Sequence, residues 1–533
     1  MINDSSVKQL NPFEIKAEIT ALIAKLYDVK NFEDYEIHYK KLDLQNDKTI
    51  IAKLLFKELT NITPENEGII KFLLVRYTEH ETLVNHLWSI IKNNMTKNST
   101  KIFALNFLRE IDTEWTYDEC EGYVNTDELA DEDTRKLLDK AIINPEVQID
   151  FLDFFQTLSV EDKIVLLQSL RDDYTGDALA NILIPVFFSQ PDSEAGKEAL
   201  SILGNSKSQL AYHALDSSLD FVNDKIKPLV KKNLSVLKLS GIREDNSKEF
   251  YTALLANSKP YRLNVTYPDG QGNQAMIFSR IDENFKVRFL GIVINDYYGI
   301  KDCFGFNELS KFECDTIIDR FYRDEKSLEI TPEEFKTILF NAELISKKSQ
   351  NWLMPYEYVC WKTLLFDIEI ENKTIKTILD EKLQKDELQE KDFNSVLNDD
   401  FTAHWFMNAD YSDEFEEFLA ELNEKLKIGD NVDFDKTVDN NINKVFYPEE
   451  KIIWRERVLN SAYLKLVTGN LTDASVLYNI YYDDNYFNSL LKFIMKKSIY
   501  EYYFNMHYSN DTSIFEEDKS ADIVSAIESK WVR

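Results

Sequence analysis

Apolar residues recur along most of the chain with the 3.6-residue period of helices, whereas one central stretch alternates with the two-residue period of strands. Near the N-terminus, a helix is predicted to follow Asn11-Pro12, with an apolar face of Ile15, Ile19, Leu22, Ile23 and Leu26. The same period predicts helices near 47–60, 65–77, 81–93 and 99–110. Residues 112–133 are acidic and aromatic with weak periodicity, so we interpret them as a long loop or an insertion. Residues 1–130 are therefore assigned to an N-terminal helical region.

The helical pattern becomes regular from residue 133 onward. Helices are predicted near 133–142, 145–157, 160–171, 176–188, 192–203, 207–218 and 222–239. The apolar positions also form an internal repeat. Leu167, Leu170, Ala178 and Ile182 recur thirty-three positions later as Leu200, Leu203, Ala211 and Leu215. A period of this length is typical of stacked helix pairs, each unable to bury its apolar face alone. We assign helical repeats to 131–248.

The stretch 261–307 carries the strand pattern. Tyr261, Leu263, Val265 and Tyr267 alternate with polar residues, and a Pro-Asp-Gly turn follows at 268–270. Further runs at 274–281 and 285–294 complete a predicted three-stranded antiparallel meander. The run 289–294 is apolar on both faces, which favours a strand covered by helices on both sides. A short helix is predicted at 249–256, and the α+β module spans 249–370.

Polar residues directly follow the third strand. Asn295, Asp296, Asp302, Cys303 and Asn307 are the candidate ligand-binding residues, in a predicted loop over 295–307. The alternative interpretation is a structural turn in which Asn295 and Asp296 bond to backbone amides. Likewise, Cys303 is either a nucleophile or a small buried thiol.

The C-terminal part, 371–533, is predicted to be an acidic helical domain. Its helix near 413–424 keeps an apolar stripe of Phe415, Phe418, Leu419 and Leu422 beneath exposed acids. That acidic face is either an ordinary solvated surface or a docking site for a basic partner. The stretch 261–307 carries equal numbers of acidic and basic residues, so we predict that the sheet is buried between the two helical halves.

Two groups of residues carry resemblances to known proteins. Ala199-Leu200-Ser201-Ile202-Leu203-Gly204, followed by Ala211 and Leu215, resembles the turn of a HEAT hairpin. Residues 272–275, 293–305 and 353–358 are similar to a β-bearing module found beside HEAT-type repeats in some bacterial proteins, for which no activity is assigned. The resemblance implies a mostly α protein: a HEAT-like solenoid, a small antiparallel sheet module and a helical C-terminal domain. It implies a concave surface for a partner protein and supplies no catalytic residue.

Composition narrows the function classes. The net charge is −32 over 533 residues, which argues against nucleic-acid and anionic-membrane binding and makes a basic protein one candidate partner. Four scattered cysteines and no signal peptide favour a cytoplasmic setting. The apolar run 178–188 is too short to span a bilayer. His80 and His86 lie on different helix faces, and no metal or cofactor motif is found, so neither is expected.

Two functional hypotheses follow. The first is a non-enzymatic interaction or scaffold protein that binds a protein partner through the inner face of the solenoid and the loop 295–307. The alternative is an enzyme or small-ligand binder with its site at the end of the strand 285–294.

Overall fold

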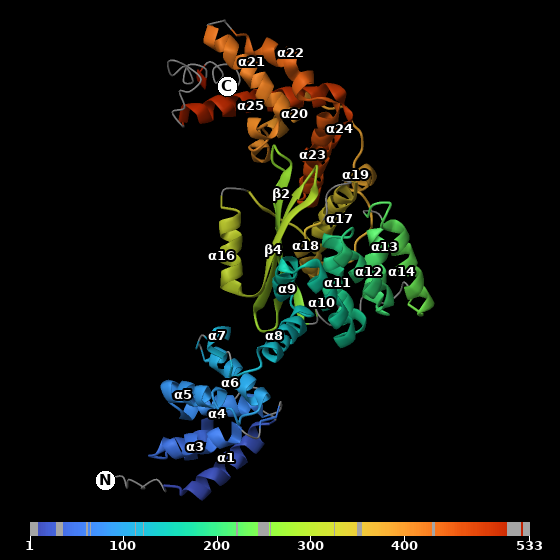
Figure 1. The fold of residues 1–533 in the computed structure, drawn as a ribbon. Coiled ribbons are helices and arrows are strands. Elements are labelled where there is room, and N and C mark those ends of the chain that lie inside the picture. Colours follow the sequence, from blue (N-terminus) through green and yellow to red (C-terminus); the bar gives the residue numbers. More distant parts are fainter. Residues whose placement is uncertain are drawn as a thin grey trace, which may run out of the picture. The chain divides into compact units, whose positions relative to one another are not determined.

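Contacts within the computed structural model divide the chain into two compact units, Met1–Lys136 and Leu137–Arg533 (Figure 1). The structure describes residues 9–27, 36–59, 62–63, 66–111, 113, 115–120, 122–219, 222–242, 255, 257–323, 326–348, 354–428, 432–508 and 524–525. The predicted helix at 249–256 lies outside these residues except for Leu255.

The first unit is helical. Its helices are α1 (Pro12–Leu26), α2 (Glu36–Asp43), α3 (Lys48–Glu58), α4 (Glu67–Tyr77), α5 (His80–Ile91), α6 (Asn98–Glu110) and α7 (Tyr117–Cys120). Four residues of the face predicted for α1, Ile15, Ile19, Leu22 and Leu26, are buried in a core that belongs to this unit alone, and Ile23 is partly buried against it. The predicted loop at 112–133 was wrong in part, because it contains α7 and the start of α8 (Thr126–Ala141). Acidic residues near the start of α8 suit a helix N-terminus, where the helix dipole stabilises negative charge, although they hide the apolar period.

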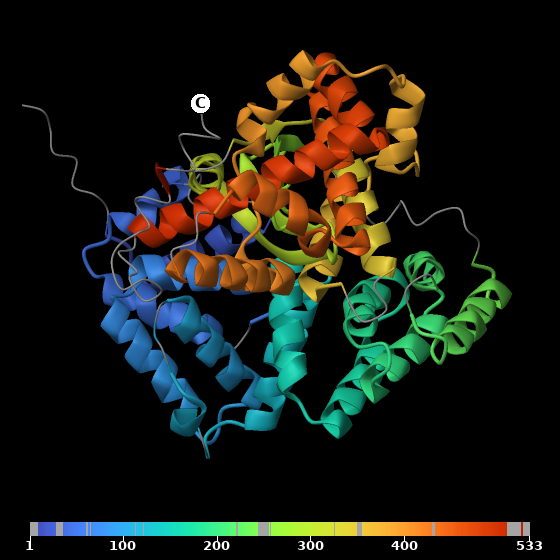
Figure 2. The same ribbon diagram turned by 90° about the horizontal axis from the view of Figure 1, so that it is seen from above.

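Six helices of the second unit confirm the helices predicted between 145 and 239. They are α9 (Pro145–Thr157), α10 (Val160–Asp173), α11 (Gly176–Ser189), α12 (Glu194–Asn205), α13 (Gln209–Ser218) and α14 (Lys227–Leu239). Alternate helices pack on each other, so that α9, α11 and α13 form one layer and α10, α12 and α14 form a second. Figure 2 shows them in cyan to green, as a row separate from the orange and red C-terminal helices.

The sheet has five strands in the order β4-β3-β2-β1-β5, with antiparallel neighbours. The strands are β1 (Ser258–Val265), β2 (Asn273–Asp282), β3 (Lys286–Asn295), β4 (Gly299–Ser310) and β5 (Leu328–Glu329). The predicted meander is confirmed as β1, β2 and β3. The predicted loop over 295–307 was wrong, because most of it is β4. A bulge beside Lys301 breaks the two-residue period there, and β4 lies at the edge of the sheet, where polar side chains are tolerated.

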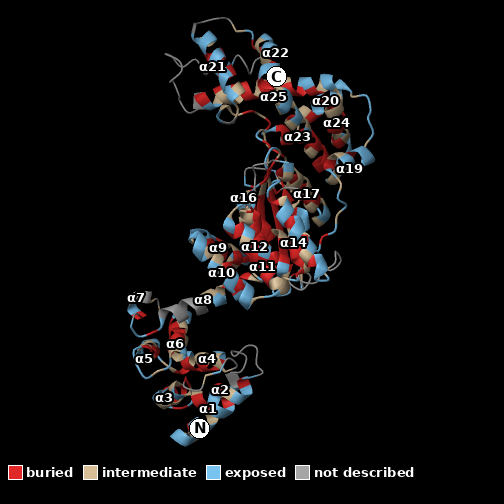
Figure 3. Ribbon diagram, turned by 45° about the vertical axis from the view of Figure 1, so that its right-hand side comes forward, coloured by how far each residue is buried: buried red, intermediate tan, exposed pale blue. Residues whose placement is uncertain are grey.

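Helices cover both faces of the sheet, as predicted for the third strand. On one face, Ile277, Val287 and Phe289 pack against α16 (Lys311–Phe321). On the other, Phe278 and Ile292 join the large core of the second unit, beside α17 (Pro332–Lys348) and α18 (Tyr356–Trp361). Figure 3 shows the resulting red, buried band through the strands.

The C-terminal part is helical, as predicted. It contains α19 (Ile375–Lys382), α20 (Glu390–Leu397), α21 (Asp413–Ile428), α22 (Phe434–Val445), α23 (Pro448–Val467), α24 (Leu471–Tyr482) and α25 (Asp484–Tyr508), with short 3₁₀ turns η4 (Asp400–Thr402) and η5 (Ala409–Tyr411); a further turn, η3 (Lys362–Leu365), follows α18 in the module. The acidic helix α21 buries the predicted stripe of Phe415, Phe418, Leu419 and Leu422. One continuous core runs from the repeats through the sheet to these helices, so the sheet is buried between them. None of the described helices is long and apolar enough to cross a bilayer.

Candidate functional site

Asn295 shapes the turn between β3 and β4. Its Oδ1 accepts hydrogen bonds from the backbone N–H groups of Tyr297 (2.9 Å) and Tyr298 (3.1 Å). Its Nδ2 donates to the backbone oxygen of Gln271 (3.1 Å), and the residue is buried. The structural interpretation of Asn295 is therefore confirmed: the side chain holds two neighbouring loops together.

The Asp296 side chain forms an ion pair with an arginine, whereas the predicted turn had it bonding to backbone amides. Its Oδ2 lies 2.7 Å from Nε of Arg457 on α23, and each side chain is only 3% exposed. Arg457 also donates to the backbone oxygen of Gly270 (2.8 Å), and its guanidinium lies over the ring of Trp454. Burial raises the pKa of Asp296, while the adjacent Arg457 opposes that shift.

The loop beside Asp296 requires glycine. Gly272 has φ of +80°, and a Cβ at this position would lie 1.9 Å from Oδ1 of Asp296. The backbone N–H of Asp296 donates to the Gly272 oxygen (3.1 Å). The glycine therefore allows the β1–β2 loop to close over the buried ion pair.

Asp302 and Cys303 lie within β4. Oδ1 of Asp302 accepts from the backbone N–H of Cys303 (2.8 Å). Cys303 is 4% exposed, and burial raises the pKa of its thiol well above the usual value. The interpretation of Cys303 as a small buried thiol is confirmed.

Asn307 lies near the opposite end of the sheet from Asn295. Because β4 runs antiparallel to β3, the bulge that contains Asn307 and Glu308 faces Arg288, seven positions before Asn295 on β3. At about 3.3 Å per residue, this separation is roughly 20 Å. The five candidate residues are thus distributed over three places and do not converge in one pocket.

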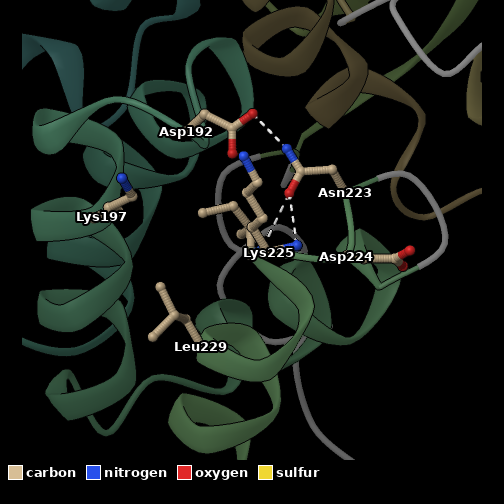
Figure 4. Close-up of a pocket in the computed structure, with 7 residues that line it drawn as sticks. Asp192, Lys197, Asn223, Asp224, Lys225 and Leu229 are labelled. Carbon is tan, nitrogen blue, oxygen red and sulfur yellow. Dashed lines mark hydrogen bonds between the residues drawn. The ribbon is translucent and has the colours of Figure 1, made fainter.

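Sequence reasoning did not identify two cavities on the helical repeats. The larger, of about 700 Å³, lies between α12 and the start of α14 and is lined by Lys197, Asn223, Lys225 and Leu229, among others (Figure 4). The Asn223 side chain donates a hydrogen bond to Asp192 across its rim. The cavity therefore mixes charged groups of both signs with an apolar surface.

The smaller cavity, of about 310 Å³, occupies the equivalent position between the starts of α10 and α12. Val160, Glu161 and Glu194 line it. The N-cap residues Ser159 and Ser193 are each followed four residues later by a lysine, Lys163 and Lys197. This recurrence is the sequence signal from which a repeated surface site could have been found.

In the described parts of the chain, no group of three or more His, Cys, Asp or Glu side chains is arranged to hold a metal ion. No protein-family model, curated protein or solved structure matches the chain. The resemblance to HEAT-repeat proteins therefore stays a prediction.

Proposed function

We propose that this protein is a non-enzymatic interaction or scaffold protein whose helical repeats, a HEAT-like solenoid, bind a partner protein. The observation that carries the proposal is the pair of cavities at equivalent positions, one between α10 and α12 and one between α12 and α14. A surface that repeats with the helices suits a partner segment that follows the repeats.

The binding surface is proposed on the α10, α12 and α14 layer. The sequence predicted the inner face of the solenoid without saying which helices form it, and in the structure α9 and α11 pack against α18. All residues of α11 from Leu179 to Phe188 are buried. The side chains of Val160 (47% exposed) and Leu229 (38%) remain accessible at the two cavities. The loop 295–307 was also predicted to bind the partner. Of that loop, the exposed Tyr297 and Tyr298 are proposed as a separate, secondary binding surface.

The proposed partner is a basic protein that contributes an extended segment. Adjacent helices of one layer lie roughly 8–10 Å apart, a distance that about three residues of extended chain cover. In the polyproline II conformation, which has three residues per turn and a rise of about 3.1 Å per residue, every third side chain of the segment would then reach a cavity. Glu161 and Glu194 are exposed in the smaller cavity and suit a lysine or arginine, in agreement with the net charge of −32.

A reducing, cytoplasmic setting is part of the proposal. It is supported by the cysteines at 120, 303, 314 and 360, which are all buried free thiols.

The test is capture of a partner from a lysate of cells that naturally produce the protein, followed by mass spectrometry. The double variant Glu161→Lys with Glu194→Lys should lose the partner while keeping the wild-type melting temperature. The control, Glu387→Lys with Glu390→Lys, places the same charge change on exposed residues at α20 and should retain it. Equal capture by both variants, or no specific partner with the wild type, would contradict the proposal.

A further inference from the structure

A third cavity, of about 460 Å³, lies beside the β2–β3 hairpin; we name it the sheet-end cavity. Its walls include Ser258 on β1, Arg280 on β2, Lys286 and Arg288 on β3, and Asn307 and Glu308 on β4. Its volume is in the range of small-molecule sites, which run from roughly 300 to 1,000 Å³. It lies on the sheet, outside the helical repeats that carry the proposed partner surface.

Arg280 makes one wall of the cavity rigid. Its guanidinium is 2% exposed and forms two hydrogen bonds with the Asp367 carboxylate (2.8 and 2.9 Å). Its remaining N–H groups donate to Ser258 Oγ, the Ser258 backbone oxygen and the Leu364 backbone oxygen. All five of its donors are thereby occupied, so Arg280 positions the start of β1 and does not itself supply a bond to a ligand.

Asn307 contributes a hydrogen-bond acceptor, its Oδ1, that no described donor satisfies. The residue is 8% exposed, and within the described chain its Oδ1 has no hydrogen-bond partner. Its backbone N–H donates to Glu146 Oε2 of α9 (3.0 Å), and the bulge in β4 places Asn307 opposite Arg288 of β3. Buried polar atoms almost always have a partner, so a water or a ligand in the cavity can supply the missing donor.

The charges of the cavity have both signs. Lys286 and Arg288 are two positions apart on β3, so they project from the same face of the strand. Glu308 lies beside Asn307, and Asp282 and Glu283 of the hairpin add two more carboxylates. A simple anion would meet the three carboxylates, and a simple cation would meet the basic pair. A molecule that carries both charges avoids both penalties.

We propose that the sheet-end cavity binds a small zwitterion of the α-amino-acid class. The ligand carboxylate lies toward Lys286 and Arg288, and its ammonium group donates to Asn307 Oδ1 and faces Glu308. This site is independent of the partner surface on the repeats, and it assigns a small-ligand function to the module.

The test is isothermal titration calorimetry of the full chain with each of the twenty common L-amino acids. At least one should bind, and its N-acetyl derivative and its amide should each bind at least tenfold more weakly. The variant Asn307→Leu should lose at least tenfold in affinity. The matched control is Asn264→Leu, which removes a second buried side-chain oxygen without a partner in the described chain, from a position that does not line this cavity.

Surface variants keep the test valid if Asn307→Leu does not fold. Lys286→Gln should weaken binding about tenfold, whereas Lys259→Gln, an exposed lysine on β1, should leave it unchanged. The proposal is overturned if no amino acid binds, if the blocked derivatives bind as well as the parent, or if Lys286→Gln keeps wild-type affinity. Competition by inorganic phosphate as strong as by the amino acid would also overturn it, because it would reveal a plain anion site.

Discussion

At the scale of single residues, the most consequential contact is the buried pair of Asp296 and Arg457. Arg457 follows Asp296 by 161 positions, and no local pattern connects them. Removing both charges from water is costly, and the pair recovers that cost through the 2.7 Å contact and the bond to Gly270. The contact joins the end of the β3–β4 hairpin to α23, so it fixes the C-terminal helices on the sheet.

Removing one partner of this pair should therefore lower the free energy of unfolding by more than removing both partners together. Asp296→Ala or Arg457→Met should each lower the free energy of unfolding by about 3–5 kcal/mol, because one buried charge is left uncompensated. The double variant Asp296→Ala with Arg457→Met should cost much less than the sum of the two single variants. Urea denaturation of the four proteins gives the double-mutant cycle. Additive costs would mean that the two groups act independently.

At the scale of elements, a polar contact connects α19 to α24. Asp380 on α19 accepts hydrogen bonds from Lys376 Nζ (2.7 Å) and from the hydroxyls of Tyr478 (2.9 Å) and Tyr482 (2.7 Å) on α24. Partial burial acts to raise the pKa of Asp380, but these hydrogen bonds outweigh it and lower the pKa to about 2.

This depressed pKa makes the stability of the α19–α24 contact depend on pH. A carboxylate whose folded pKa lies below its unfolded pKa stabilises the protein above the unfolded value, near 3.8. That stabilisation is lost as pH falls through about 2. At pH 7 the free energy of unfolding of wild type should exceed that of Asp380→Asn by about 1 kcal/mol. This value allows for solvent screening, because the carboxylate is partly exposed. The difference should shrink between about pH 4 and pH 2 in denaturation experiments.

The matched control is Asp386→Asn, which changes an exposed aspartate in the same part of the chain. It should show no comparable loss of stability relative to wild type. A difference between wild type and Asp380→Asn that stays constant from pH 7 to pH 2 would contradict the assigned role of the carboxylate.

At the scale of the whole molecule, each unit has its own core. Leu73 belongs to the core of the first unit, and Ile292 belongs to the core that links repeats, sheet and C-terminal helices. Both side chains are fully buried. The second core is continuous, so the elements around it should unfold together.

Ile292→Ala should therefore lower the stability of the whole second unit by about 2–5 kcal/mol, through lost burial and a cavity. Differential scanning calorimetry should show two transitions, of which Ile292→Ala lowers one and Leu73→Ala lowers the other. Hydrogen exchange in Ile292→Ala should accelerate in both α12 and α24. Acceleration in only one of these helices would show that the sheet does not join the two helical parts.

The sequence alone determined those helices and strands whose buried face produces a periodic spacing of apolar residues. The repeat helices α9 to α14, the strands β1 to β3 and the stripe of α21 follow from apolar spacing, because a helix or strand with one covered face repeats its apolar residues at a fixed interval. Apolar spacing did not predict β4, because the bulge beside Lys301 interrupts the two-residue period. It also did not predict the start of α8, because that segment is acidic.

Only the tertiary structure decided where side chains from distant elements meet. The antiparallel turn after Asn295 carries Asn307 to the other end of the sheet, so residues that are neighbours in sequence cannot form one site. The pairing of Asp296 with Arg457, the burial of Cys303 and the cavity around Asn307 all depend on contacts across many residues. Such contacts leave no periodic mark in one sequence, because they are selected by packing in three dimensions and not by the geometry of any single helix or strand.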